Sequence, residues 1–134
     1  MHTGDATHPA RPRILLVEDN PVDQQIMLRV LRRVGMAADV HVADTIGAAR
    51  EVIAAHRIAH MFLDNTLPDG HGANFILELA ASGVLQSLPV TLVTDWPSPF
   101  MFEKAKRAGV RAVIQKAEFR PDRIRGLLGP PAVT

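Results

Sequence analysis

Cysteine is absent from the 134 residues of this chain, and aromatic residues make up only 4% of it. Without cysteine the protein can hold no disulfide framework, no thiol nucleophile and no thiolate-bound metal. Nothing in this composition indicates an oxidising compartment, so we expect the protein to be cytoplasmic.

An excess of charge of one sign is also lacking, because 15 lysines and arginines face 14 aspartates and glutamates, for a formal net charge of +1. This balance gives no large field to hold nucleic acid or an anionic membrane, since such binding depends on many phosphate contacts. No apolar run approaches the roughly 18 to 20 residues that a membrane span needs. We therefore expect a soluble protein that binds neither nucleic acid nor membrane.

The length suits one ordinary domain, which we predict over residues 13–128. Residues 1–12 lack the charged-then-apolar order of a secretory signal, and we predict a disordered tail there. Residues 129–134 carry two prolines, and we expect them to fray.

Two kinds of apolar segment alternate along the chain. Short runs that indicate buried strands lie at 14–17, 40–42, 61–63, 90–93 and 112–114. Between them apolar residues recur at helical spacing, as in Ile26, Val30, Leu31 and Val34. Five strand-helix units predict an α/β fold with a parallel sheet covered by helices on both faces.

Capping residues mark the expected helix ends. Asn20 followed by Pro21 is typical of a helix start, and Gly35 of a helix end. The same rules predict further helix starts at Asp44, Ser98 and Pro121, and further ends near His56, Gly83 and Gly109.

Charged and hydroxyl side chains follow the strands. Glu18 and Asp19 follow the first strand, Asp64 ends the third, Thr94 the fourth, and Lys116 lies beyond the fifth. In an open parallel sheet these ends border one crevice, so we expect the residues to converge. Three carboxylates repel one another unless a cation shares them, and hard oxygen ligands suit Mg²⁺. With a hydroxyl and an ammonium added, such a pocket can hold a phosphoryl group, which makes Asp64 the candidate nucleophile.

Four segments carry a resemblance to a known family. They are Ile14-Leu-Leu-Val-Glu-Asp-Asn-Pro, Phe62-Leu-Asp-Asn-Thr-Leu-Pro-Asp-Gly-His-Gly, Leu92-Val-Thr and Ile114-Gln-Lys. In this order they resemble the signature segments of response-regulator receiver domains of two-component signalling, chemotaxis-regulator-like single-domain receivers in particular. The resemblance spans about residues 13 to 128. It implies a flavodoxin-like, doubly wound (βα)5 three-layer sandwich whose five parallel strands have the order 2-1-3-4-5.

The resemblance also implies a role for each residue of the crevice. Asp64 is the phosphoacceptor, and it binds Mg²⁺ directly together with Asp19 and the Thr66 carbonyl. Glu18 acts on the metal through water. The phosphoryl oxygens are held by Thr94 and Lys116.

The family implies signalling by phosphoryl transfer. A phosphohistidine of a sensor histidine kinase or phosphotransfer protein donates to Asp64, and the acyl phosphate draws in Thr94. The face formed by the fourth helix, fifth strand and fifth helix then changes shape by a population shift. On this basis the chain is a single-domain phosphorelay regulator, a monomer or weak homodimer, that contacts a downstream protein the sequence does not name. We expect no enzymatic activity beyond acceptance and loss of its own phosphoryl group.

Three positions depart from the family pattern. Asp95 stands where receivers place a small residue after the switch threonine, and its charge can repel a phosphodonor. Val113 occupies the position of the aromatic switch and has no ring to swing inward. Lys116 precedes Ala117 instead of the proline of a cis peptide bond, so we expect either a trans bond or a strained cis bond.

Aromatic residues before and within the predicted fourth helix suggest a docking surface. We predict that Trp96, Phe100 and Phe102, with Val113, form the partner surface, although plain burial in the core is the alternative. The six histidines show no metal-ligand spacing, and we interpret them as scattered surface or loop groups.

Other functions stay open. A phosphorylation-independent interaction module of the receiver fold keeps the acidic pocket while Asp95, Val113 and Ala117 remove the switch. A flavodoxin-like cofactor binder needs Gly, Ser and Thr amides after the first strand, where this chain has Glu18 and Asp19. A DNA-binding regulator is disfavoured because we find no helix-turn-helix residues after the last predicted helix.

Overall fold

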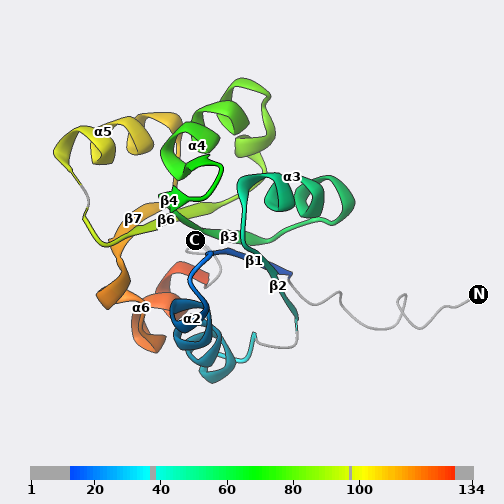
Figure 1. Cartoon of the computed structure of the whole chain (residues 1–134), viewed down its shortest axis with the longest axis vertical. Helices are drawn as coiled ribbons and strands as arrows, with labels where there is room; N and C mark the ends of the chain where they lie inside the picture. Colours follow the sequence, from blue (N-terminus) through cyan, green and yellow to red (C-terminus); the bar gives the residue numbers. More distant parts are fainter. Residues whose placement is uncertain (1–12, 37–38, 97, 129–134) are drawn as a thin grey trace, which may run out of the picture.

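A five-stranded parallel sheet forms the centre of the protein (Figure 1). The computed structural model describes residues 13–36, 39–96 and 98–128, so the tails predicted at 1–12 and 129–134 lie outside the described residues. The strands are β1 (Ile14–Val17), β2 (Val40–Ala43), β3 (His60–Asp64), β6 (Val90–Thr94) and β7 (Ala112–Gln115). Their order across the sheet, β2-β1-β3-β6-β7, confirms the predicted order 2-1-3-4-5.

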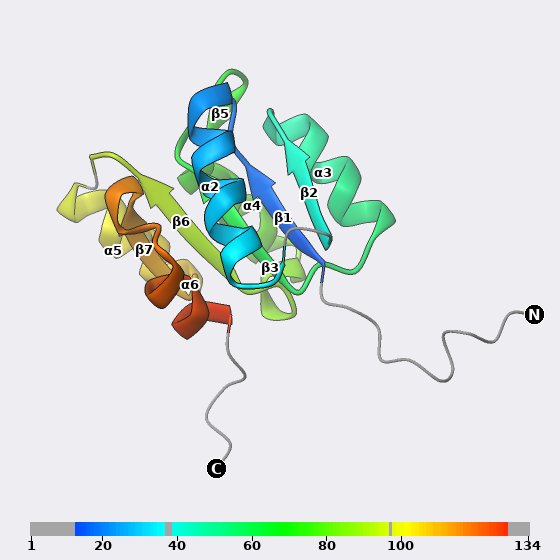
Figure 2. The same ribbon diagram turned by 90° about the horizontal axis from the view of Figure 1, so that it is seen from below.

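Helices cover both faces of this sheet, as Figures 1 and 2 show. One face carries α3 (Ile46–Ala55), α4 (Gly72–Ala81) and α5 (Pro99–Ala108), and the other carries α2 (Pro21–Arg33) and α6 (Pro121–Leu128). Side chains alternate along β1. Leu15 and Val17 pack in the core beneath α3, α4 and α5, and Ile14 and Leu16 pack in the core beneath α2 and α6. The two cores account for the unbroken apolar run of β1, all of which is buried.

Capping explains where most helices begin. The Asn20 side chain accepts hydrogen bonds from the backbone N of Val22 (2.9 Å) and of Asp23 (3.0 Å), which confirms the predicted start of α2. Ser98 caps α5 as predicted, through the backbone N of Met101 at 3.0 Å. The prediction of Asp44 as a cap is wrong, because the extended residue that caps α3 is its neighbour Thr45.

The predicted apolar stripe of α2 is confirmed at Val30, Leu31 and Val34, which pack in the core shared with α6, but not at Ile26. Ile26 is 50% exposed, whereas Met27 and Leu31 are buried against the sheet. An isoleucine and a methionine side by side satisfy the helical period almost equally, so the spacing alone did not select the buried one.

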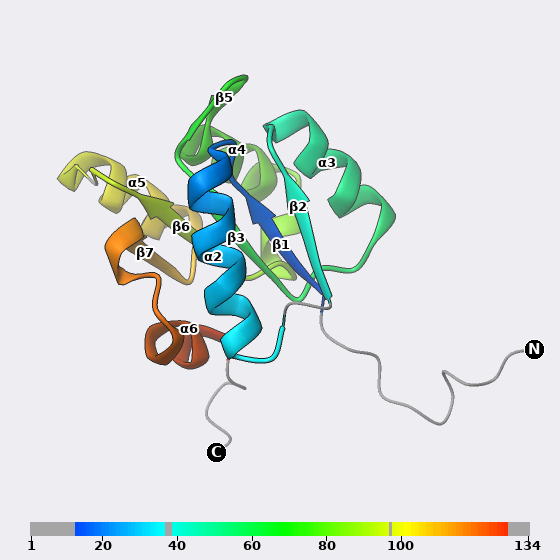
Figure 3. The ribbon, with the colours of Figure 1, turned by 60° about the horizontal axis from the view of Figure 1, so that its bottom comes forward.

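Four short elements were not predicted. Strands β4 (Thr66–Leu67) and β5 (Gly70–His71) form a hairpin, and Figure 3 shows it at the end of the sheet where α2 begins. Two 3-10 helices, η2 (Val84–Gln86) and η3 (Lys116–Glu118), extend the connections after α4 and β7. No helix in the described part of the chain is long and apolar enough to cross a membrane.

His60 contradicts the interpretation of the histidines as surface or loop groups. It begins β3, is 2% exposed, and its Nε2 lies 2.8 Å from the Thr91 hydroxyl of the neighbouring strand β6. Burial lowers the pKa of His60 to about 4. The native protein therefore holds this imidazole neutral well below its ordinary titration range.

We predict that His60 makes the protein acid-sensitive. The unfolded imidazole binds a proton below about pH 6.5, whereas the folded one resists protonation down to about pH 4. The stabilising contribution is therefore complete above pH 6.5, and up to about 3 kcal/mol of it is lost as the pH falls towards 4. Urea unfolding at several pH values should show this slope in wild type and a flatter one in His60→Gln. Equal pH dependence of the unfolding free energy in the two proteins contradicts a buried, neutral His60.

Close packing at Gly72 yields a second prediction. A Cβ there would overlap the Asp64 carbonyl oxygen and approach Leu63 Cγ to 3.1 Å, so Gly72→Ala forces α4 away from the end of β3. We expect a loss of about 1 to 3 kcal/mol in the free energy of unfolding. Gly126→Ala is the matched control, because a Cβ on this α6 residue meets nothing within 4 Å and should stabilise by up to about 1 kcal/mol. Equal effects of the two substitutions in denaturant unfolding would be the contrary result.

Candidate functional site

Three carboxylates meet at the carboxyl end of the sheet. Glu18, Asp19 and Asp64 each offer a carboxylate oxygen within 4.8 Å of the others. Strand register explains this, because Val17 of β1 lies opposite Leu63 of β3 and the acids come directly after. Glu18 is fully buried, Asp64 is 6% exposed and Asp19 is exposed, so the group opens to solvent on one side.

The Glu18 carboxylate is held firmly but is only partly satisfied. Its Oε2 accepts a hydrogen bond from the backbone N of Asn20 at 3.0 Å. The backbone carbonyl of Glu18 accepts another from Gln24 Nε2 at 2.6 Å. Glu18 Oε1 is buried and accepts no hydrogen bond from any described residue. Such an oxygen requires positive charge nearby, because a buried unpaired carboxylate is strongly destabilising.

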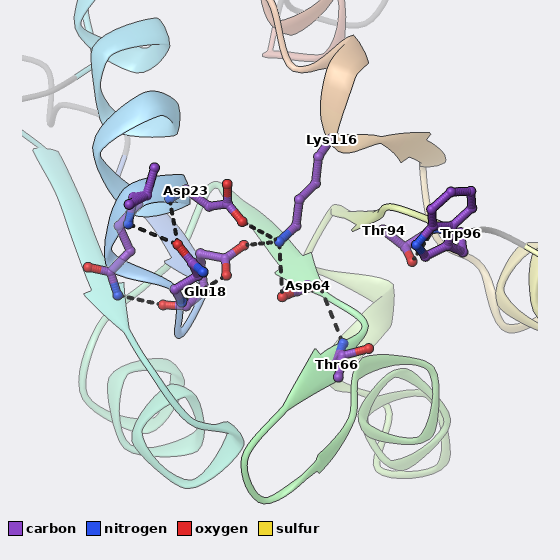
Figure 4. A network of polar contacts seen from close by, with 10 residues as sticks. Glu18, Asp23, Asp64, Thr66, Thr94, Trp96 and Lys116 are labelled. Carbon is purple, nitrogen blue, oxygen red and sulfur yellow. Dashed lines mark hydrogen bonds and ion pairs between the residues drawn. The ribbon is translucent and has the colours of Figure 1, made fainter.

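Lys116 supplies part of that charge (Figure 4). Its Nζ lies 3.0 Å from Glu18 Oε1 and 3.6 Å from Asp64 Oδ2. The nearest carboxylate is that of Asp23, whose Oδ2 accepts a hydrogen bond from Nζ at 2.7 Å. Asp23 is an acid in the first turn of α2 and was not predicted as a site residue. Its contact with Lys116, 93 residues away in the chain, requires the fold to bring α2 beside η3.

The backbone at Lys116 settles one open alternative. Cis peptide bonds are absent from the described residues, so the Lys116–Ala117 bond is trans. The lysine begins η3, where the Glu118 carboxylate accepts a hydrogen bond from the backbone N of Gln115 at 2.7 Å in a capping box.

Electrostatics in the cluster favour an additional cation. Burial raises the pKa of Asp64 and of Glu18, and their mutual repulsion adds to the effect at Glu18. Burial alone lowers the pKa of Lys116, but the hydrogen bond to Asp23 and the charges of Glu18 and Asp64 outweigh it and raise the pKa. One ammonium therefore faces more negative charge than it neutralises.

The loop after Asp64 is tied to two helices. The Asn65 carbonyl accepts from Gly72 N at 2.7 Å and its side chain from Ala73 N at 3.0 Å, which fixes the start of α4. Asp69, in the β4–β5 hairpin, accepts from the backbone N of Ile46 at 2.8 Å and of Gly47 at 2.9 Å, at the start of α3. Asp69 and Gly72 thus hold this loop in place.

The two threonines predicted in the site lie on either side of it. The Thr66 backbone N donates to Asp64 Oδ1 at 3.3 Å. Thr94 is buried at the end of β6, and its hydroxyl accepts from the backbone N of Trp96 at 3.4 Å, apart from the lysine in Figure 4. The hydroxyl of Thr94 is thus engaged with its own loop and not with Asp64.

The predicted partner residues differ in exposure. Trp96 is 86% exposed, Phe100 78% and Phe102 40%, so plain burial of these aromatics is ruled out. Val113 is half-buried against the core beneath α3, α4 and α5. A groove of about 740 Å³ beside Phe100 is lined by Leu77, Pro99, Phe100, Glu103, Lys104, Arg107 and Ala108. That a partner binds this surface stays a prediction.

The donors at the cluster fit a hard divalent cation. Glu18 Oε1 is buried with the shared Lys116 ammonium as its partner, and oxygens of Asp19 and Asp64 lie within 4.8 Å of the glutamate's carboxylate. Mg²⁺ takes such oxygen ligands and keeps several waters, which suits a cluster with one exposed member.

Comparisons with known proteins agree on one family. The family model of the response regulator receiver domain matches residues 14–128. The two-component response regulator ORR3 of Oryza sativa is 27% identical over 117 residues, which are 87% of each chain.

Solved structures share the fold. A CheY-like receiver domain protein of Methanospirillum hungatei has a TM-score of 0.75 at 22% identity, over 87% of this chain and 90% of that one. CheY4 of Vibrio cholerae has a TM-score of 0.76 at 21% identity, over 89% and 97%. A response regulator of Burkholderia pseudomallei with a phosphorylated aspartic acid, a calcium ion and citrate has a TM-score of 0.75 at 21% identity, over 88% and 66%.

We predict that the cluster stores electrostatic strain which a cation relieves. Asp64→Asn should raise the free energy of unfolding without divalent cation, because burial disfavours the charge. Adding Mg²⁺ should stabilise wild type by about 2.7 kcal/mol at a hundredfold excess over Kd, and the variant by less.

Asp44→Asn provides the matched control for this measurement, since Asp44 is exposed and lies outside the cluster. Thermal unfolding with and without Mg²⁺ gives the readout. A destabilised Asp64→Asn protein in the absence of the cation contradicts the account.

Proposed function

Because the chain belongs to the response regulator receiver domain family, we propose that it is a regulator that accepts a phosphoryl group on Asp64 with Mg²⁺ bound. One observation carries the proposal: three carboxylates lie within 4.8 Å of one another, and the Lys116 ammonium is 3.6 Å from the Asp64 carboxylate. A nucleophile, a cation site and a fixed ammonium are the groups that phosphoryl transfer requires.

The transfer is a displacement at phosphorus. An Asp64 carboxylate oxygen attacks the phosphorus of a phosphohistidine on a histidine kinase or phosphotransfer protein. The bond from phosphorus to the imidazole nitrogen breaks as the bond to the carboxylate oxygen forms, and the imidazole leaves.

Residues around Asp64 stabilise the added charge. We propose Asp19, Asp64 and the Thr66 carbonyl as direct ligands of Mg²⁺, with Glu18 acting through water. When bound, the ion neutralises charge on the phosphoryl oxygens. Lys116 holds another of these oxygens, and Thr94 turns from Trp96 towards the phosphoryl group.

The relatives support the choice of cation and acceptor. A calcium ion and a phosphorylated aspartic acid are present in the Burkholderia pseudomallei response regulator, which shares the fold. The name of the rice relative places it in two-component signalling. We propose the same class of donor, a phosphohistidine, for this chain.

We further propose that the output is a protein contact. Trp96 and Phe100 present exposed apolar surface next to the loop that Thr94 begins, so movement of this threonine alters the surface directly. In this scheme Trp96, linked to Thr94, transmits the change that an aromatic residue at the position of Val113 would transmit. The cytoplasmic location, the absence of nucleic-acid and membrane binding, and the monomeric or weakly dimeric state remain predictions.

A phosphorylation-independent interaction module is the second candidate. Exposed Asp95 beside Thr94, and the engagement of the Thr94 hydroxyl with Trp96, favour it. In that case a partner binds equally well with and without a phosphodonor.

We predict a single phosphoryl adduct when the protein is incubated with Mg²⁺ and acetyl phosphate. Intact-mass spectra of acid-quenched samples should show it in wild type and not in Asp64→Asn, because the displacement needs the carboxylate oxygen. Lys116→Met should slow adduct formation by at least about tenfold, a loss of about 1.4 kcal/mol in transition-state stabilisation.

Asp44→Asn is the control here too and should behave as wild type. An adduct that persists in Asp64→Asn, or none in wild type with small donors and histidine kinases alike, contradicts the proposal. The latter result favours the phosphorylation-independent module.

A further inference from the structure

Asp23 lies at the site without a role in the scheme above. It is the third residue of α2, and its Oδ2 is the carboxylate oxygen nearest to Lys116 Nζ, at 2.7 Å. The corresponding distances are 3.0 Å to Glu18 and 3.6 Å to Asp64. The ammonium is therefore hydrogen-bonded to Asp23 and not to the proposed phosphoacceptor.

We propose that Asp23 is a positioning residue that withholds the Lys116 ammonium in the resting protein and competes for it with the phosphoryl group on Asp64. The inference rests on the proposed function, since it concerns how Lys116 becomes available to the acceptor. Asp23 touches neither donor nor cation in this scheme and acts only through the lysine.

The backbone on both sides of the contact is fixed. The Asp23 backbone N donates to the Asn20 cap at 3.0 Å, which holds the first turn of α2 in place. Lys116 begins η3, whose capping box closes through Gln115 and Glu118 at 2.7 Å. The ammonium contacts Asp23 and Glu18 while lying 3.6 Å from Asp64, so a phosphoryl group on Asp64 competes with Asp23 for its hydrogen bonds.

Partial burial strengthens the contact between Asp23 and Lys116. The side chain of Lys116 is 17% exposed and that of Asp23 is 31% exposed, so water screens the pair less than it does an open surface pair. A charge-assisted hydrogen bond in this setting is stronger than one between neutral groups. In this proposal a phosphoryl group on Asp64 has to draw the ammonium against the hydrogen bond to Asp23.

Removing the charge of Asp23 should release the lysine. Asparagine can still accept a hydrogen bond but no longer pairs with the ammonium, so Asp23→Asn should accept a phosphoryl group about three- to tenfold faster than wild type at saturating Mg²⁺. Asp23→Glu keeps the charge and should restore a rate near that of wild type.

A role of Asp23 in α2 alone makes a different prediction. An acid in the first turn stabilises a helix through the macrodipole whether or not Lys116 is present. Loss of that role lowers stability but does not accelerate phosphoryl acceptance. The two roles separate in a double-mutant cycle with Lys116→Met, because only positioning needs the lysine.

The experiment measures initial rates of adduct formation by intact mass, with acetyl phosphate as donor and saturating Mg²⁺. The proteins are wild type, Asp23→Asn, Asp23→Glu, Lys116→Met, the Asp23→Asn/Lys116→Met double variant and Asp44→Asn. The last removes an exposed acid that follows β2 at the same edge of the sheet, and it controls for a general effect of charge. Where Lys116→Met forms too little adduct, Mg²⁺-dependent beryllofluoride binding, followed by fluorine NMR, completes the cycle.

We expect acceleration in Asp23→Asn alone, with Asp44→Asn and Asp23→Glu near wild type and no effect of Asp23→Asn once Lys116 is methionine. The inference is overturned if Asp23→Asn is as slow as wild type or slower. It is also overturned if Asp44→Asn accelerates equally, or if the acceleration persists without Lys116. Wild type that neither forms the adduct nor binds beryllofluoride overturns the proposed function as well, which distinguishes the two failures.

Discussion

The carboxylate of Glu18 is fully buried at the carboxyl end of β1 and has to be matched by positive charge. Much of the structure around it serves this requirement. The Asn20 backbone donates to Oε2, and the Lys116 ammonium, which two further carboxylates share, is the one partner of Oε1 among the described residues. That deficit makes a divalent cation beside Glu18 the natural completion of the site.

The sequence was sufficient for the sheet and for the convergence of its acids. Strand β1 is bounded as predicted, and capping by Asn20 and Ser98 depends on neighbours within three residues. Convergence of Glu18 and Asp64 follows from parallel register, which the alternation of strands and helices already implies. These features are local or repeat along the chain, and they can therefore be predicted from the sequence alone.

Other features depend on contacts that no local pattern contains. The rotation of α2 about its axis, which buries Met27 and exposes Ile26, is set by packing against the sheet. The Asp23–Lys116 hydrogen bond spans 93 residues, and Asp69 reaches the start of α3 from 22 residues away. His60 was misplaced for a related reason, because a polar side chain is buried when a neighbouring strand supplies a partner such as Thr91.

Formation of an acyl phosphate on Asp64 is the step on which the proposed function depends. Borohydride reduces an acyl phosphate to an alcohol with loss of phosphate, which converts an aspartyl phosphate into homoserine. Peptide mapping after treatment with Mg²⁺, acetyl phosphate and borohydride should find homoserine at position 64. Homoserine at no position, or reduction at a different carboxylate such as Asp19, contradicts the central claim.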